Sequence, residues 1–61
     1  MSNTVELSGE IKHETENAIL FWDGDMEDWI PLSQVSEIHK KPNGSVEIVV
    51  AEWIAKKKGF I

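Results

Sequence analysis

The stretch that decides the fold is Ala18-Ile-Leu-Phe-Trp-Asp-Gly-Asp-Met-Glu-Asp-Trp-Ile-Pro31. Its apolar run, residues 18–22, is followed by an Asp-Gly pair that favours the tight turn of a β-hairpin. We therefore predict antiparallel strands at residues 18–22 and 27–31. Pro31 is expected to end the second strand, because proline has no N–H for the ladder. Both faces of the first strand are apolar, so we expect it to be central and covered on both sides.

More strands are predicted on either side of this hairpin. Residues 4–13 alternate apolar and polar side chains, which is the period of a half-buried strand. Gly9 interrupts the apolar side of this strand and suggests a bulge or a sharp bend there. The remaining elements before the C-terminal segment are a turn or short 3₁₀ helix at 32–34, strands at 35–39 and 45–50, and a turn at 41–44.

The period changes near residue 51, and residues 51–58 favour a helix of about two turns. Glu52 lies in its first turn and three lysines lie in its last turn, which matches the helix dipole. Gly59 is placed for a left-handed C-cap. We predict a single domain over residues 1–61, mainly β (α+β): a curled antiparallel five-stranded sheet or small SH3-like open barrel with a short C-terminal helix. The alternative is a flatter sheet covered on one face by the helix.

The net charge of −5 is unevenly distributed along the chain. Residues 1–39 carry nine acidic side chains against one lysine, whereas residues 40–61 carry five lysines against two glutamates. We therefore predict a domain with two electrically distinct ends. The chain has no arginine, the preferred residue for recognising phosphates and bases, which argues against direct nucleic-acid binding. The acidic surface instead suits a partner protein with a basic surface.

Catalytic and cofactor chemistry is not indicated by the residue types present. The absence of cysteine excludes disulfides, thiolate metal sites and a cysteine nucleophile. His13 and His39 are interpreted as ordinary strand-end residues, and Ser33 lacks the sequence of a nucleophile elbow. A walled pocket is also hard to build from 61 residues. We predict a binding domain, not an enzyme, with no cofactor and no metal site.

The acidic turn at residues 23–28 is the most suggestive segment for binding. As a calcium loop it begins with suitably spaced carboxylates, but Asp28 stands where glycine is needed and Gln34 where a bidentate glutamate is needed. Two interpretations remain, a solvated turn and an acidic epitope for a basic partner. The candidate partner-binding residues are Asp23, Asp25, Glu27, Asp28 and Trp29.

The three tryptophans bear on stability and on oligomeric state. A chain this short has a marginal core worth about 3–5 kcal/mol. We expect at least two of Trp22, Trp29 and Trp53 to be mostly buried, and the third to anchor an interface. Either this packing suffices for a monomer or a homodimer completes the core.

The N-terminal segment carries no targeting signal that we recognise. Met1-Ser-Asn-Thr4 has no basic region and no long apolar run, so we expect no signal peptide and no membrane association. A cytoplasmic location follows as the expectation.

A resemblance to small phage and prophage proteins is carried by two segments, Trp29-Ile-Pro-Leu-Ser-Gln34 and Glu52-Trp-Ile-Ala-Lys-Lys-Lys-Gly59. Those proteins share a Trp-Ile-Pro-x-Ser-Gln turn and a Glu-Trp-x-Ala-x-Lys-x-Gly tail. A proline often precedes the glutamate of that tail, whereas Ala51 stands there in this chain. The resemblance implies a phage origin, the cytoplasm of the host cell, and a role such as an anti-CRISPR or anti-restriction inhibitor. It implies no site residues.

Three functions are therefore open. The first is a protein-binding inhibitor of a host nucleic-acid-handling or defence protein. The second is a small nucleic-acid or ligand-binding module, with a groove lined by an exposed tryptophan and the lysines at 40, 41 and 56–58. The third is a structural or assembly role.

Overall fold

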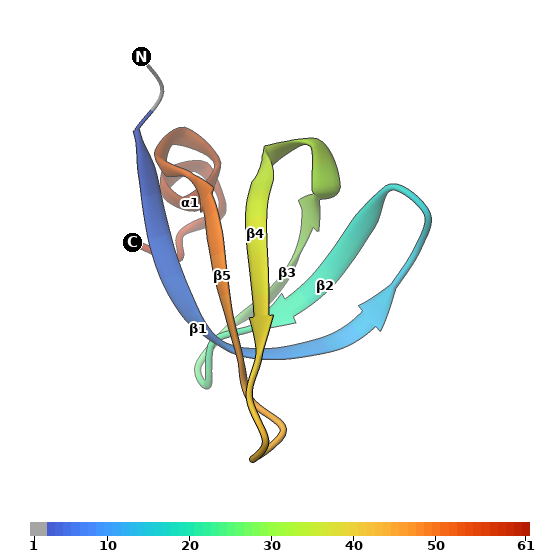
Figure 1. The fold of residues 1–61 in the computed structure, drawn as a ribbon. Helices are drawn as coiled ribbons and strands as arrows, with labels where there is room; N and C mark the ends of the chain where they lie inside the picture. The colour runs from blue at the N-terminus through green and yellow to red at the C-terminus, as the bar shows by residue number, and fades with distance from the viewer. Residues whose placement is uncertain (1–2) are drawn as a thin grey trace.

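The computed structural model describes residues 3–61, which form one antiparallel sheet of five strands followed by a short helix (Figure 1). The strand order in the sheet is β3-β2-β1-β5-β4. The mainly β fold class with a C-terminal helix is confirmed, and so is each predicted element. Their bounds are β1 Thr4–Glu14, β2 Ala18–Trp22, β3 Glu27–Pro31, the 3₁₀ helix η1 Leu32–Gln34, β4 Val35–Lys40, β5 Val46–Ala51 and α1 Glu52–Lys58. Met1 and Ser2, which belong to the segment used to predict the absence of a signal peptide, lie outside the described residues.

β1 is the longest strand and joins the two halves of the sheet. Its first part, Thr4 to Gly9, pairs with β5, and its second part, from Glu10 onward, pairs with β2. The strand bends between these two ladders, so the sheet curls (Figure 1). Of the two alternatives predicted at Gly9, the structure has the bend, because the two ladders meet there, whereas the register irregularity lies between Ile11 and His13. Gly9 marks the point where β1 exchanges one partner strand for the other.

The sheet does not close into a barrel. Within residues 3–61, β3 and β4 are its two edge strands, and η1 connects them in the chain. Every residue of β4 after Val35 is exposed, as expected for an edge strand that no other element covers. The curled, open sheet is therefore the correct alternative, and the flatter sheet is not.

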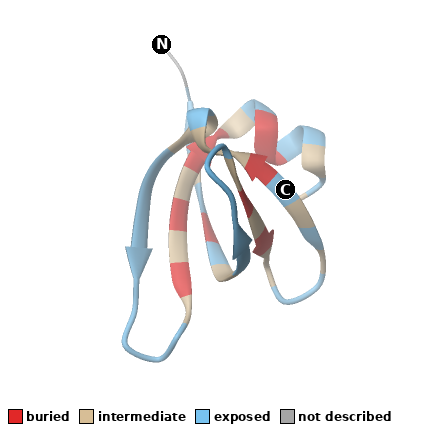
Figure 2. Ribbon diagram, turned by 90° about the vertical axis from the view of Figure 1, so that its right-hand side faces the viewer, coloured by how far each residue is buried: buried red, intermediate tan, exposed pale blue. Residues whose placement is uncertain are grey.

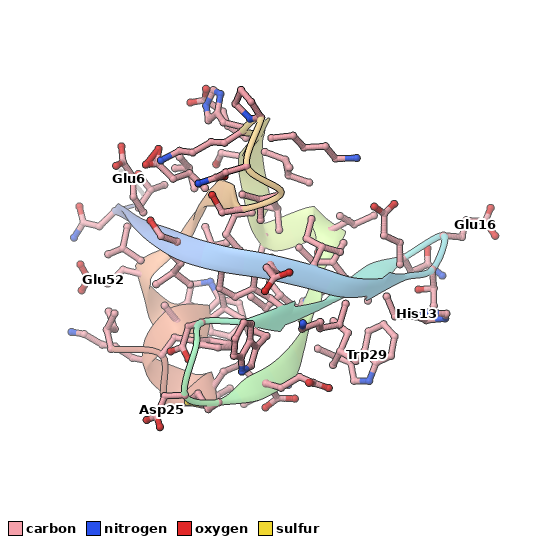
Figure 3. All side chains as sticks on the ribbon, turned by 90° about the horizontal axis from the view of Figure 1, so that it is seen from below. Glu6, His13, Glu16, Asp25, Trp29 and Glu52 are labelled. Carbon is pink, nitrogen blue, oxygen red and sulfur yellow. The ribbon has the colours of Figure 1, made fainter. Side chains whose placement is uncertain are left out.

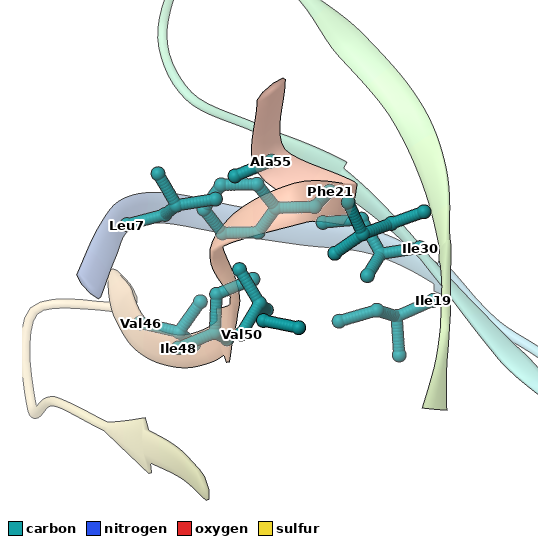
Figure 4. Packing of buried hydrophobic residues seen from close by; sticks show 10 residues of the cluster. Leu7, Ile19, Phe21, Ile30, Val46, Ile48, Val50 and Ala55 are labelled. Carbon is teal, nitrogen blue, oxygen red and sulfur yellow. The ribbon is translucent and has the colours of Figure 1, made fainter. Parts of the chain in front are cut away.

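The core lies inside the curl and beneath α1. Phe21, Ile30, Ile48 and Val50 have no exposed surface, and they come from β2, β3 and β5 (Figure 4). The complete buried cluster is Leu7, Ile19, Phe21, Ile30, Val46, Ile48, Val50, Ala51, Ile54 and Ala55. Buried and less buried positions alternate along β2 and along most of β5, as the predicted period of two requires (Figure 2).

Two expectations about the core are wrong. β2 is not covered on both sides, because Ile19 and Phe21 are buried whereas Ala18, Leu20 and Trp22 are only half-buried. Among the described residues the buried cluster also contains none of the tryptophans, since Trp29 and Trp53 keep 38% and 54% of their surface exposed. The physical reason is that, within residues 3–61, the seven-residue helix α1 covers only the inner side of the sheet.

The ends of α1 are satisfied by backbone groups. The N–H of Glu52 donates to the carbonyl oxygen of Asn3 at 2.9 Å, so the helix begins without a side-chain cap at Ala51. Gly59 adopts the predicted left-handed conformation, with φ of 85°, and its N–H donates to the carbonyls of Ala55 and Lys56. This helix end brings the Phe60 ring to 5.6 Å from the Phe21 ring, measured between centroids. None of the helical segments in residues 3–61 is long and apolar enough to cross a lipid bilayer.

Candidate binding face

The outer side of the β1–β2–β3 half of the sheet carries the candidate site. Residues directly opposite each other on paired strands point to the same side of a sheet. One cross-strand row is His13, Leu20 and Trp29, and the neighbouring row is Glu10, Trp22 and Glu27. We call this surface, completed by Lys12, the outer face; its members are Glu10, Lys12, His13, Leu20, Trp22, Glu27 and Trp29.

The first row is an aromatic pair on either side of an aliphatic side chain. The rings of His13 and Trp29 meet edge to face, with centroids 6.0 Å apart and planes at 88°. Figure 3 shows these two labelled side chains next to each other. Leu20 is their cross-strand neighbour on β2 and is half-buried. The row therefore presents apolar surface to solvent on the side of the sheet that no helix of residues 3–61 covers.

The second row holds a cation on an aromatic ring. The Lys12 ammonium lies 4.4 Å from the centroid of the Trp22 ring, within the range of a cation–π contact. The same ammonium lies 3.6 Å from a carboxylate oxygen of Glu10. Glu27 is opposite Trp22 on its other side, across the β2–β3 ladder. Trp22 is thus flanked in register by two carboxylates, with a lysine of the same chain over its ring.

Of the five predicted binding residues, the structure places Glu27 and Trp29 on the outer face. Asp28 does not join them, because its cross-strand partner is the buried Phe21 and it therefore points to the other side of the sheet. There it lies 3.8 Å from the Lys58 ammonium. Asp25 is exposed at the tip of the turn. The acidic turn consequently does not act as one surface.

Asp23 has a structural role in the β2–β3 turn. Its Oδ1 accepts the backbone N–H groups of Asp25 and Met26 at 2.9 and 2.8 Å. These two hydrogen bonds, first that from Met26, lower the pKa of the Asp23 carboxyl below its usual value, because they stabilise the ionised form. A carboxylate held in this way shapes the turn, and its accepting oxygen is already engaged.

The predicted separation of charge into two ends is wrong. α1 carries the basic end of the chain back to the acidic turn, where Lys58 meets Asp28. The Lys40–Lys41 pair lies at the β4–β5 turn, at the far end of the molecule from α1 (Figure 1). Within residues 3–61 the lysine ion pairs are Lys12–Glu10, Lys41–Glu47, Lys56–Glu52 and Lys58–Asp28. The lysines therefore do not gather into one groove.

An open pocket of about 240 Å³ lies between the second part of β1 and the β4–β5 turn. Its lining includes Ile11, Glu14, Lys40 and Lys41. Within the part of the chain that the structure describes, no three histidine or acidic side chains gather to hold a metal ion. His39 contacts Glu37 at 3.0 Å on the exposed strand β4 and does not line this pocket.

Five members of the outer face were not predicted from the sequence: Glu10, Lys12, His13, Leu20 and Trp22. The alternation along residues 18–22 already separates Leu20 and Trp22 from Ile19 and Phe21. It does not say which of the two sets faces solvent, because both are apolar. Comparison of the chain with protein-family models, with curated proteins and with solved structures finds no match.

Proposed function

We propose that this protein is a small protein-binding domain that uses its outer face to cover a basic surface of a partner, and that it acts as an inhibitor of a nucleic-acid-handling or defence protein. The observation that carries the proposal is the combination on one sheet face of exposed aromatic surface and flanking carboxylates. Trp29 keeps 38% of its surface exposed and lies beside Leu20, while Glu10 and Glu27 flank Trp22.

Each component of this face suits an interface with a basic protein. Tryptophan is enriched among the residues that dominate binding energy, and a half-exposed tryptophan gains burial when a partner covers it. The carboxylates, together with the net charge of −5, favour encounter with positive surfaces. Proteins that handle nucleic acid expose such positive surfaces, which supports the inhibitor as the functional class.

The resemblance to phage and prophage proteins supports a phage origin and action in the host cytoplasm. The nucleic-acid alternative receives no comparable support. Lys40 and Lys41 lie far from Lys56, Lys57 and Lys58, and most of these lysines contact carboxylates of the same chain.

The test begins with proteins captured from a bacterial host lysate on the immobilised chain, followed by purification of each candidate. Binding is then measured for the wild type, for Trp29→Ala, and for Trp53→Ala as a matched control on α1. We expect Trp29→Ala to weaken binding by about 2 kcal/mol or more, and Trp53→Ala by less than about 0.5 kcal/mol. Affinity should also fall as salt rises from about 50 to about 300 mM.

Inhibition is measured separately, as loss of nucleic-acid binding by the captured protein when an equimolar amount of the chain is added. Affinity that does not change with salt, or equal losses for the two tryptophan variants, would contradict the proposed interface. Tight binding without any effect on the partner's nucleic-acid binding would contradict the inhibitor role alone. Recovery of only the chain itself would favour the assembly role.

A further inference from the structure

We infer that the Trp22 ring, with Glu10 and Glu27 on either side, is a receptor for a lysine or arginine side chain of the partner, and that Lys12 occupies it in the free protein. This inference rests on the proposed function and specifies the chemistry of the same face. Its occupant is a side-chain cation on a basic segment of the partner protein.

The geometry of Lys12 supports this assignment. Its ammonium is 4.4 Å from the Trp22 ring centroid and 3.6 Å from Glu10, so a cation already has both an aromatic face and a carboxylate as neighbours. The Lys12 and Glu10 side chains nevertheless remain 42% and 44% exposed, so the contact is open to solvent. An exposed lysine of this kind is held weakly and can be exchanged for another cation.

The position of Lys12 in β1 also explains how a cation of the partner can replace it on the Trp22 ring while the sheet stays folded. Lys12 lies at the register irregularity between Ile11 and His13, where β1 has one residue more than β2. Its side chain is exposed. Movement of Lys12 away from Trp22 leaves the β1–β2 ladder intact and exposes a ring flanked by two carboxylates.

While Lys12 occupies the Trp22 ring, the apparent affinity for a cation of the partner is reduced to the fraction of molecules in which the ring is free. An exposed cation–π contact is weak enough that removing Lys12 should tighten cation binding by about three- to sixfold. The Lys12→Met variant removes the ammonium and keeps most of the apolar stem. The Lys57→Met variant changes the net charge equally but lies on α1, and it therefore controls for general electrostatics.

The experiment uses the full chain and an eight-residue peptide of alternating arginine and glycine, with a lysine–glycine peptide and a neutral citrulline–glycine peptide for comparison. Binding is followed through the three tryptophan indole N–H signals in two-dimensional NMR spectra. We expect the cationic peptides to shift the Trp22 signal saturably and to leave Trp53 unchanged. Lys12→Met should bind the arginine–glycine peptide about three- to sixfold more tightly than the wild type does. Lys57→Met should bind it less than about twofold more tightly. Glu10→Gln should weaken binding.

Equal tightening by the two lysine variants, an unmoved Trp22 signal at saturation, or equal binding of the citrulline peptide would overturn the inference. The proposed function would still hold after any of those results if a captured basic partner binds the wild type more tightly than Trp29→Ala. If no variant of the outer face changes binding of the partner, both the proposed function and the inference are contradicted. Shifts of the Trp22 signal with protein concentration alone would assign the receptor to a second copy of the chain and also overturn the inference.

Discussion

The carbonyl oxygen of Trp22 approaches Gly9 so closely that a β-carbon on Gly9 would lie 1.9 Å from it. The same β-carbon would lie 2.9 Å from the Asp23 Cα. Both obstacles are backbone atoms, so rotation of a side chain cannot relieve the contact. Because Gly9 has no side chain, the end of β2, which carries Trp22, can lie directly against the bend of β1.

Replacement of Gly9 by alanine should therefore unfold most of the protein. Overpacking against a rigid backbone costs about 1–3 kcal/mol or more, which is comparable to the whole stability expected for a chain of this length. Urea denaturation monitored by circular dichroism measures the change. Ser8→Ala, at the neighbouring exposed position, is the matched control and should stay within about 0.5 kcal/mol of the wild type. A folded, equally stable Gly9→Ala protein would contradict the role assigned to this close approach.

Aromatic residues inside and outside the core should respond very differently to truncation. Phe21 is fully buried, and Phe21→Ala should cost about 3–5 kcal/mol and unfold the chain. Phe21→Leu should remain folded with reduced stability, so the position can still be measured. Trp53→Ala should cost only about 1 kcal/mol, because 54% of Trp53 is exposed and its main polar contact is a 3.0 Å hydrogen bond to Gln34. Thermal denaturation compares the three, and a Trp53→Ala loss as large as that of Phe21→Ala would contradict the assigned core.

The β2–β3 turn should become less stable in acid because of Asp23. The folded-state pKa of this carboxyl lies below its unfolded value, so its ionised form stabilises the folded state above the unfolded pKa. That stabilisation is lost as the pH falls through the lowered folded-state pKa. Asp23→Asn keeps an accepting oxygen but does not titrate.

The stability difference between the wild type and Asp23→Asn should therefore be constant near about pH 7 and shrink towards about pH 2. Chemical denaturation across this range measures it, and Asp25→Asn, at the exposed turn tip, is the control. A difference that grew on acidification would contradict the role assigned to Asp23.

The C-cap of α1 should depend on chirality at residue 59. The backbone φ of Gly59 is 85°, a value that L-residues adopt only with strain. A β-carbon there would make only ordinary contacts with the Met26 side chain at 3.7 Å, so the cost of Gly59→Ala should be conformational, at about 1 kcal/mol. The chain is short enough for chemical synthesis, and D-alanine at this position should be neutral or stabilising. Equal losses for L- and D-alanine would indicate a packing effect instead.

The local elements of this protein are determined by short-range sequence. The Asp23-Gly24 pair between two strand-forming runs predicts the β2–β3 hairpin, and the lysines before Gly59 predict the end of α1. These signals need only neighbouring residues, because turn and cap geometry depends on a few backbone dihedral angles. The alternation in residues 4–13 likewise predicts β1, but the position of its bulge depends on how β2 and β5 divide that strand between them.

The candidate site, in contrast, was decided by tertiary structure. In β2 the sequence defines two apolar sets, and only the curl of the sheet and the placement of α1 decide that Phe21 is buried and Trp22 faces outward. The distribution of charge over the surface likewise could not be predicted from the sequence. The acidic and basic parts of the chain are separate in sequence but meet in space at Asp28 and Lys58. Periodicity is a local property and can separate the two faces of a strand. Which face is covered depends on contacts between residues far apart in the chain, here those that place α1 against the inner side of the sheet.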